Sequence, residues 1–180
     1  MNQMMPIETW KFINSFAPWF SAIGTFFAVA LSLYFSYTSR RIKLKVTSDI
    51  YEYNEEGVKN EYIIIQITNE GFRDVSINNC IFQFGRLGKT NIGIGQKHID
   101  PSKSCQFPYR LEENTTTHLA IKLNQKNDYN YLQNLFNNYL DVSCIKSLRI
   151  VVYPNVGKPF KGKLGKTIQA ELNKIAKKTT

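Results

Sequence analysis

Basic side chains crowd the C-terminal part of the chain at spacings that suit phosphate binding. Residues 146–180 hold nine of the 23 lysines and arginines but only one of the 14 acidic residues, Glu171. Clustered lysines attract polyanions, and interleaved aromatic rings can stack bases. The pattern is typical of nucleotide or single-stranded DNA binding, but a solubilising segment or attraction to anionic lipid explains the same charges. The candidate phosphate ligands in this segment are Lys158, Lys161, Lys163 and Lys166.

A second basic group follows the longest apolar run of the sequence and consists of Arg40, Arg41, Lys43 and Lys45. Basic residues beside a membrane helix mark its cytoplasmic flank, so this group has a topological explanation. Arg40, Arg41 and Lys43 are also candidate phosphate ligands. The sequence leaves open which of the two basic groups would meet an anion.

Motifs for other chemistry are incomplete. Gly157–Lys163 fits the G-x-x-x-x-G-K pattern of a phosphate-binding loop, but Leu164 replaces the Ser or Thr that would hold magnesium, and Pro159 removes an amide donor. His98 and His118 are 20 residues apart, and neither has metal-ligand spacing to a cysteine. We therefore expect no metal, no cofactor and no enzymatic activity, although serine, histidine and aspartate residues far apart in sequence can still converge in space.

The basic groups must be positioned by a membrane helix and a folded domain. Between Lys11 and Arg40 lie 28 residues without a charge, and residues 16–37 are long and apolar enough to cross a ~30 Å hydrocarbon layer as a helix. Pro18 fits the first turn of such a helix. The basic flank after residue 39 predicts a single-pass protein with its N-terminus outside and its C-terminal domain in the cytoplasm.

A cleaved signal peptide is the competing interpretation, because Ala28–Ala30 resembles a cleavage site. The apolar run is longer than the ~7–15 residues of a signal-peptide core and continues to Tyr37, which favours a retained anchor. The cysteines are odd in number, contain no C-x-x-C pair and favour a reducing compartment. They are Cys80, Cys105 and Cys144.

Small residues recur along one face of the expected helix and allow another helix to approach closely. This face predicts a homo-oligomer. Two forms remain open: helices packed through the small residues, whose hydroxyls can bond their own backbone, or four or more helices around a pore lined by that face. The face consists of Ser21, Gly24, Thr25, Ala28, Ser32 and Ser36.

The segment after residue 40 predicts a mainly β domain, an antiparallel, immunoglobulin-like β-sandwich with one or two short helices. Apolar residues alternate from Ile42, and residues 61–69 have the composition of a buried strand. Turn residues recur at the spacing of a sandwich. Further strands are expected at 74–77, 80–84, 104–107, 116–123 and 148–153.

Two helices are expected within this domain. Residues 127–142 carry apolar side chains at helical spacing, and Asn127 or Asp128 can cap the first turn. Residues 167–178 form a weaker, basic amphipathic pattern. The chain therefore divides into an anchor at 1–39 and a cytoplasmic domain at 40–180. Only a very short segment joins the expected helix to the first expected strand.

This arrangement resembles the small membrane effectors of bacterial anti-phage defence. It combines an outside N-terminus, a helix with a small-residue face, an Arg40-Arg41 stop, and a β-sandwich with Asn69-Glu-Gly71 before a strand. The resemblance is closest to channel effectors of the Hailong type, whose partner nucleotidyltransferase makes a short deoxyadenosine oligomer that holds the channel shut. It implies a tetrameric or larger channel in the bacterial inner membrane, abortive infection as the outcome, and a single-stranded DNA signal from a neighbouring nucleotidyltransferase. A membrane-tethered adaptor, whose sandwich docks a cytosolic protein without any pore, is the alternative.

Overall fold

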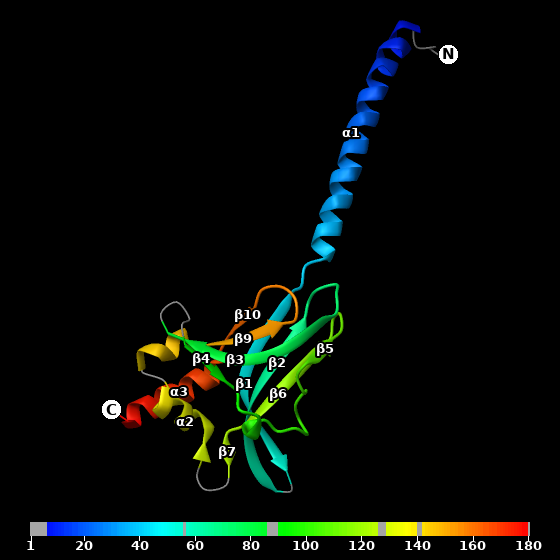
Figure 1. Ribbon diagram of the computed structural model, residues 1–180. Helices are drawn as coiled ribbons and strands as arrows, with labels where there is room; N and C mark the ends of the chain where they lie inside the picture. Colours follow the sequence, from blue (N-terminus) through cyan, green and yellow to red (C-terminus); the bar gives the residue numbers. More distant parts are fainter. Residues whose placement is uncertain (1–6, 56, 86–89, 126–128, 140–141, 180) are drawn as a thin grey trace. The chain divides into compact units, whose positions relative to one another are not determined.

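The computed structural model describes residues 7–55, 57–85, 90–125, 129–139 and 142–179. The chain divides into two compact units, Met1–Arg41 and Ile42–Thr180 (Figure 1). The first unit contains one long helix, and the second is an antiparallel β domain with two main sheets and short helices. The expected fold class is therefore confirmed.

Helix α1 spans Ile7–Ser39, and its part Ser15–Ser39 is long and apolar enough to cross a membrane, with a mean hydropathy of 1.6. Large apolar side chains such as Trp19 and Phe20 are at least 70% exposed in this unit, a distribution that water disfavours. The expectation that Pro18 lies in the first turn is wrong. The helix begins at Ile7, upstream of the uncharged run, so Pro18 lies inside it.

The first sheet has three antiparallel strands in the order β1-β2-β6. Their bounds are β1 Leu44–Glu55, β2 Val58–Asn69 and β6 Thr116–Lys122. A tight hairpin joins β1 to β2, and Gly57 supplies the positive φ (82°) that this turn requires. Strand β2 is central and buried on both faces, because Ile63 and Ile65 enter the main core while Tyr62 packs with Ile64 on the other face.

The second sheet runs in the order β10-β9-β3-β4, and β5 pairs with the other part of β3. Its bounds are β3 Val75–Phe84, β4 Thr90–Gly93, β5 Tyr109–Leu111, β9 Arg149–Pro154 and β10 Phe160–Lys163. The inward faces of both sheets form one apolar core, together with the helices of the domain. Strand β9 lies inside this sheet, which explains its unbroken buried run Ile150–Val152.

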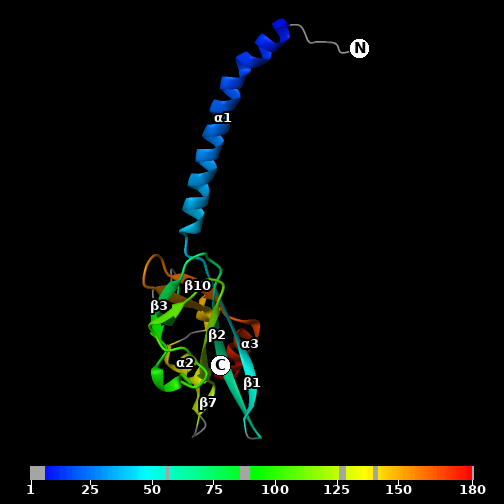
Figure 2. The same ribbon diagram turned by 90° about the vertical axis from the view of Figure 1, so that its right-hand side faces the viewer.

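Short elements complete the domain (Figure 2). They are η2 Gln96–His98, β7 Asn124–Gln125, β8 Tyr129–Asn130, α2 Tyr131–Tyr139, η3 Val142–Ser147 and α3 Lys166–Thr179. Helices α2 and α3 contact each other, and α3 buries Ile168 and Leu172. Asn130 caps α2, since its side-chain oxygen accepts a hydrogen bond of 3.0 Å from the Gln133 amide. The expected caps, Asn127 and Asp128, lie outside the described residues.

Several expected strands differ from the observed ones. The strands expected at 74–77 and 80–84 are one strand, β3, which begins at Val75, and its pairing with β9 shifts register between Ile77 and Asn79. Residues 104–107 form no strand, and β5 follows them instead. Cys105 is nevertheless tied to β6, because its amide donates to the His118 carbonyl over 3.0 Å. Helix α2 starts four residues later than expected, whereas α3 matches its expected range.

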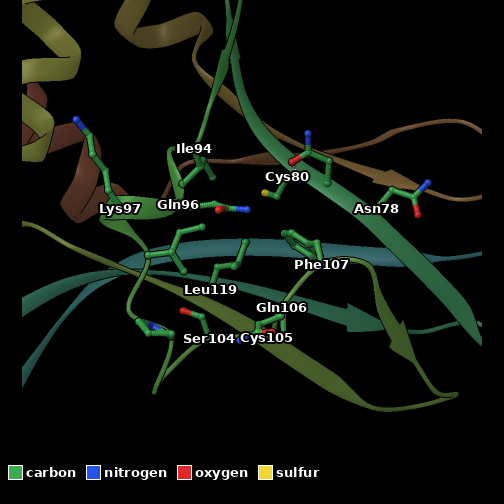
Figure 3. A pocket seen from close by; sticks show the side chains of 13 residues that line it. Asn78, Cys80, Ile94, Gln96, Lys97, Ser104, Cys105, Gln106, Phe107 and Leu119 are labelled. Atoms are coloured by element: carbon green, nitrogen blue, oxygen red, sulfur yellow. Dashed lines mark hydrogen bonds between the residues drawn. The ribbon is translucent and has the colours of Figure 1, made fainter.

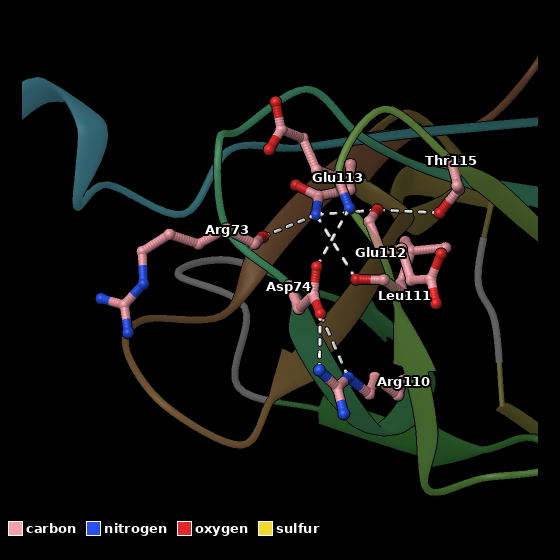
Figure 4. Close-up of polar contacts among 8 residues, drawn as sticks. Arg73, Asp74, Arg110, Leu111, Glu112, Glu113 and Thr115 are labelled. Carbon is pink, nitrogen blue, oxygen red and sulfur yellow. Dashed lines mark hydrogen bonds and ion pairs between the residues drawn. The ribbon is translucent and has the colours of Figure 1, made fainter.

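The turn between β2 and β3 is held by Asn69, which is fully buried. Figure 4 shows the polar contacts around this turn, with Arg73, Leu111 and Glu112 close together. The side-chain amide nitrogen of Asn69 donates to the carbonyl oxygens of Arg73 (2.8 Å), Glu112 (3.1 Å) and Leu111 (3.4 Å). Its side-chain oxygen accepts a hydrogen bond of 3.0 Å from the Gly71 amide. One carboxamide therefore joins the β2–β3 turn to the β5–β6 connection.

Candidate functional site

A groove of about 740 Å³ lies between β1 and β10 and combines residues from both ends of the domain sequence. Lys45 enters it from β1, while Lys161 and Lys163 enter it from β10. The remaining lining residues are Leu44, Val46, Thr47, Ser48, Asp49, Glu70, Gly162 and Gly165. The fold thus brings together one lysine that follows helix α1 in the sequence and two lysines of the C-terminal basic segment.

The β10 lysines are displayed by strand alternation. Lys161 and Lys163 are exposed, whereas Gly162 between them is buried against β1. A Cβ atom at Gly162 would lie 2.6 Å from the Val46 carbonyl oxygen, so only glycine allows this approach. The close contact holds β10 beside β1 and fixes both lysines along the groove.

The groove carries more positive than negative charge. Lys45 lies 3.6 Å from Glu70, but both side chains are more than half exposed, so this pair contributes little. Asp49 accepts hydrogen bonds from Thr167 and from the Ile50 amide (3.0 Å). Among the described residues, the ammonium groups of Lys161 and Lys163 form no ion pair. Two cations are therefore open to an external anion.

The other candidate phosphate ligands do not line this groove. Lys158 lies exposed in the β9–β10 turn, and Lys166 is the exposed first residue of α3. Lys43 is exposed just before β1. Their role in anion binding stays a prediction.

The two arginines after the apolar run belong to the helical unit. The Arg41 guanidinium lies 4.3 Å from the centre of the Tyr37 ring and also donates to the Tyr37 hydroxyl. This stacking engages one face of the cation. Arg40 is exposed.

The glycines of the incomplete phosphate-loop motif have structural explanations. Gly157 adopts φ +99° in the β9–β10 turn, and Gly162 permits the contact with β1. Gly162 and Lys163 lie in strand β10, rather than at the helix N-terminus that cradles phosphate in such loops.

The small-residue face of α1 is open in the helical unit. A Cβ atom at Gly24 would meet no atom within 4 Å, and Ser32 and Ser36 are exposed. Thr25 bonds within its own helix, since its hydroxyl donates to the Ser21 carbonyl over 2.8 Å. The hydroxyls of Ser32 and Ser36 make no hydrogen bond within the described part of the chain.

A second cavity of about 720 Å³ lies between the two sheets (Figure 3). Cys80 approaches it from β3 and Leu119 from β6, and Cys105 lines it from the connection before β5. Burial, with a contribution from Cys105, raises the pKa of the Cys80 thiol to about 12, and burial also raises the pKa of Cys105. Both thiols are therefore protonated and weakly nucleophilic at neutral pH.

His98 is a structural residue. It is buried against Tyr131, with the two ring centres 5.0 Å apart. Burial and the neighbouring Lys97 lower the pKa of the imidazole. Among the described residues, no three His, Cys, Asp or Glu side chains come together as a metal site.

Comparison with protein-family models, with curated proteins and with solved structures finds no match for this chain.

Proposed function

We propose that this protein is an oligomeric, single-pass membrane effector, a channel of bacterial anti-phage defence gated by a nucleotide or oligonucleotide on its cytoplasmic domain. The observation that carries the proposal is the lysine-lined groove built on β1. This strand begins five residues after the apolar helix ends, and the groove joins it to β10.

Ligand binding in this groove would act on β1, the strand that follows the membrane helix in the sequence. A phosphate chain between Lys45 and the β10 lysines would replace the repulsion among these ammonium groups by charge-assisted hydrogen bonds to phosphate oxygens. It would thereby favour one arrangement of β1 and β10 over another, which is what a ligand must do to shift a conformational equilibrium. A neighbouring nucleotidyltransferase is the natural source of such a ligand.

The membrane part of the proposal follows from α1. The uncharged stretch Ser15–Ser39 spans the bacterial inner membrane with its N-terminus outside, because the basic residues follow it. Four or more copies pack around an axis with the small-residue face inward. The hydroxyls of Ser32 and Ser36 then face the pore, and its conductance depends on pore width.

Ser32→Leu tests the pore. The added apolar volume should narrow and dewet the constriction, so we expect ion flux through proteoliposomes to fall at least about tenfold. Ala30→Leu is the matched control, because it adds a similar side chain about 160° around the helix, where lipid or a neighbour accommodates it. Unchanged flux in the Ser32→Leu protein with intact oligomers would exclude this face as the pore lining.

A membrane-tethered adaptor is the second candidate. The Thr25 hydroxyl is already bonded to its own helix, an arrangement that suits a packed helix pair as well as a pore. An adaptor would retain its location and its cytosolic partner in the Ser32→Leu protein and would conduct no ions in either form.

A further inference from the structure

We propose that Phe72 and Val156, at the tips of two turns of the β domain, insert into the lipid headgroup layer and hold this end of the domain on the membrane surface. This inference rests on the membrane insertion of α1 proposed above. It adds a lipid-contacting surface to the domain itself.

Both side chains are exposed to solvent. Phe72, in the β2–β3 turn, is 59% exposed, and Val156, in the β9–β10 turn, is 68% exposed. Each turn is held firmly: Asn69 braces the first, and the Asn155 amide donates to the Ser76 carbonyl over 2.7 Å in the second. Because hydrogen bonds hold both turns in place, the exposure of their apolar tips is built into the fold.

The two turns converge on the first residue of the domain. Ile42 shares a hollow of about 330 Å³ with both turns. The other residues of this hollow are Arg73, Asp74, Val75, Ser76, Arg110, Asn155 and Val156. A Cβ atom at Gly157 would lie 3.9 Å from the Ile42 side chain. In both views the turns lie at the end of the domain where β1 begins (Figures 1 and 2).

Chain length sets how far this end can be from the bilayer. Ile42 follows Ser39, the last residue of the apolar span, by three residues, which extend to about 11 Å at most. The headgroup layer on each side of the hydrocarbon core is roughly 5–8 Å thick. Turns that pack around Ile42 therefore lie within reach of this layer.

The charges beside the tips are mixed. Arg73 and Lys158 are exposed and lie one and two residues after the apolar tips. Asp74 is engaged by Arg110 at 2.7 Å, and this hydrogen bond lowers the pKa of the carboxyl group. Glu112 and Glu113 are exposed in the neighbouring connection and oppose anionic lipid, so apolar insertion rather than net charge drives the contact.

Phe72→Trp, in a background with Trp10→Phe and Trp19→Phe, reports the depth of the first turn. The full-length protein is reconstituted into vesicles of phosphatidylcholine and phosphatidylglycerol, with or without lipids brominated near the headgroup. We expect blue-shifted emission from position 72 and at least twofold quenching by the brominated lipid.

Val58→Trp in the same background is the matched control. Val58 is 61% exposed but lies in the β1–β2 hairpin, at the far end of a 12-residue strand, roughly 40 Å from Ile42. We expect its emission to stay red-shifted and unquenched.

Equal quenching at positions 72 and 58 would overturn the proposal. A blue shift at position 72 without lipid quenching would also overturn it and assign the patch to a second copy of the domain. Flotation of the same vesicles separates these results from failure of the proposed function, because a protein that does not float with lipid has no inserted helix.

Discussion

Asn69→Asp is expected to destabilise the β domain by about 3 kcal/mol or more at neutral pH. The new carboxylate would face the carbonyl oxygens of Arg73, Leu111 and Glu112 without a proton to donate. Buried acceptors would lose their donor, and the introduced charge would have no cation among the contacts of Asn69. The hydrogen bond donated by the Gly71 amide would be the remaining favourable contact of the new carboxylate.

Urea unfolding of the full chain in mild detergent, followed by far-ultraviolet circular dichroism, measures this loss. Asn78→Asp is the control, since Asn78 is exposed and should lose less than about 0.5 kcal/mol. Burial favours the neutral acid, which retains one donor, so the stability of the Asn69→Asp protein relative to the parent should fall as pH rises. An equal, pH-independent effect of both substitutions would contradict the bracing role of Asn69.

Gly165→Ala is expected to lower the free energy of unfolding of the β domain by about 2–4 kcal/mol, because β1 leaves no room for a side chain at this position. A Cβ atom at this position would lie 2.1 Å from the Ser48 carbonyl oxygen and 2.8 Å from the Asp49 carboxylate. These are a β1 backbone atom and a bonded side chain, so the start of α3 must move away from β1. The hydrogen bond of 3.3 Å from the Gly165 amide to the Ser48 hydroxyl would be lost with it.

The same movement should displace β10 and its lysines, so groove function should fall together with stability. Gly93→Ala is the control, because a Cβ atom at Gly93 would meet no atom within 4 Å. That substitution should leave the stability of the domain unchanged or raise it by up to about 1 kcal/mol, because alanine lowers the conformational entropy of the unfolded chain. A Gly165→Ala protein as stable as the Gly93→Ala protein would show that β1 and α3 are not in close contact.

Local sequence patterns predicted the elements whose signal is continuous. The uncharged run ending at Ser39, the apolar strand around Ile63–Ile67 and the amphipathic helix with Ile168 and Leu172 all match the structure. Each carries its own hydrophobic periodicity, so no distant contact is needed to specify it.

Elements that depend on distant partners were missed. Strand β10 is only four residues long, and its glycine and lysines resemble a loop until Val46 is placed beside Gly162. Residues 104–107 have strand composition, yet Cys105 is turned toward the cavity beside Cys80 and the pairing with β3 starts at Tyr109. Tertiary context decides such short segments.

The sequence predicted the lysines of the candidate groove but not that they lie together. Both basic groups were visible in the sequence, but Lys45 and Lys161 are more than 100 residues apart, and only the packing of β10 on β1 shows that they share one surface. Asp49 and Glu70, which moderate the charge of the groove, carried no sequence signal. The cavity beside Cys80 was not predicted, because its lining comes from several separate segments.

Native mass spectrometry tests the central claim most directly. The full-length protein would be extracted in mild detergent from cells that also express its genomic neighbours. We predict assemblies of four or more chains with a nuclease-sensitive adduct. The Lys161→Glu/Lys163→Glu protein should keep its assembly and lose the adduct, whereas Lys59→Glu/Lys174→Glu, outside the groove, should keep both. A bare monomer or dimer of the unmodified protein would contradict the ligand-gated channel and support the tethered adaptor.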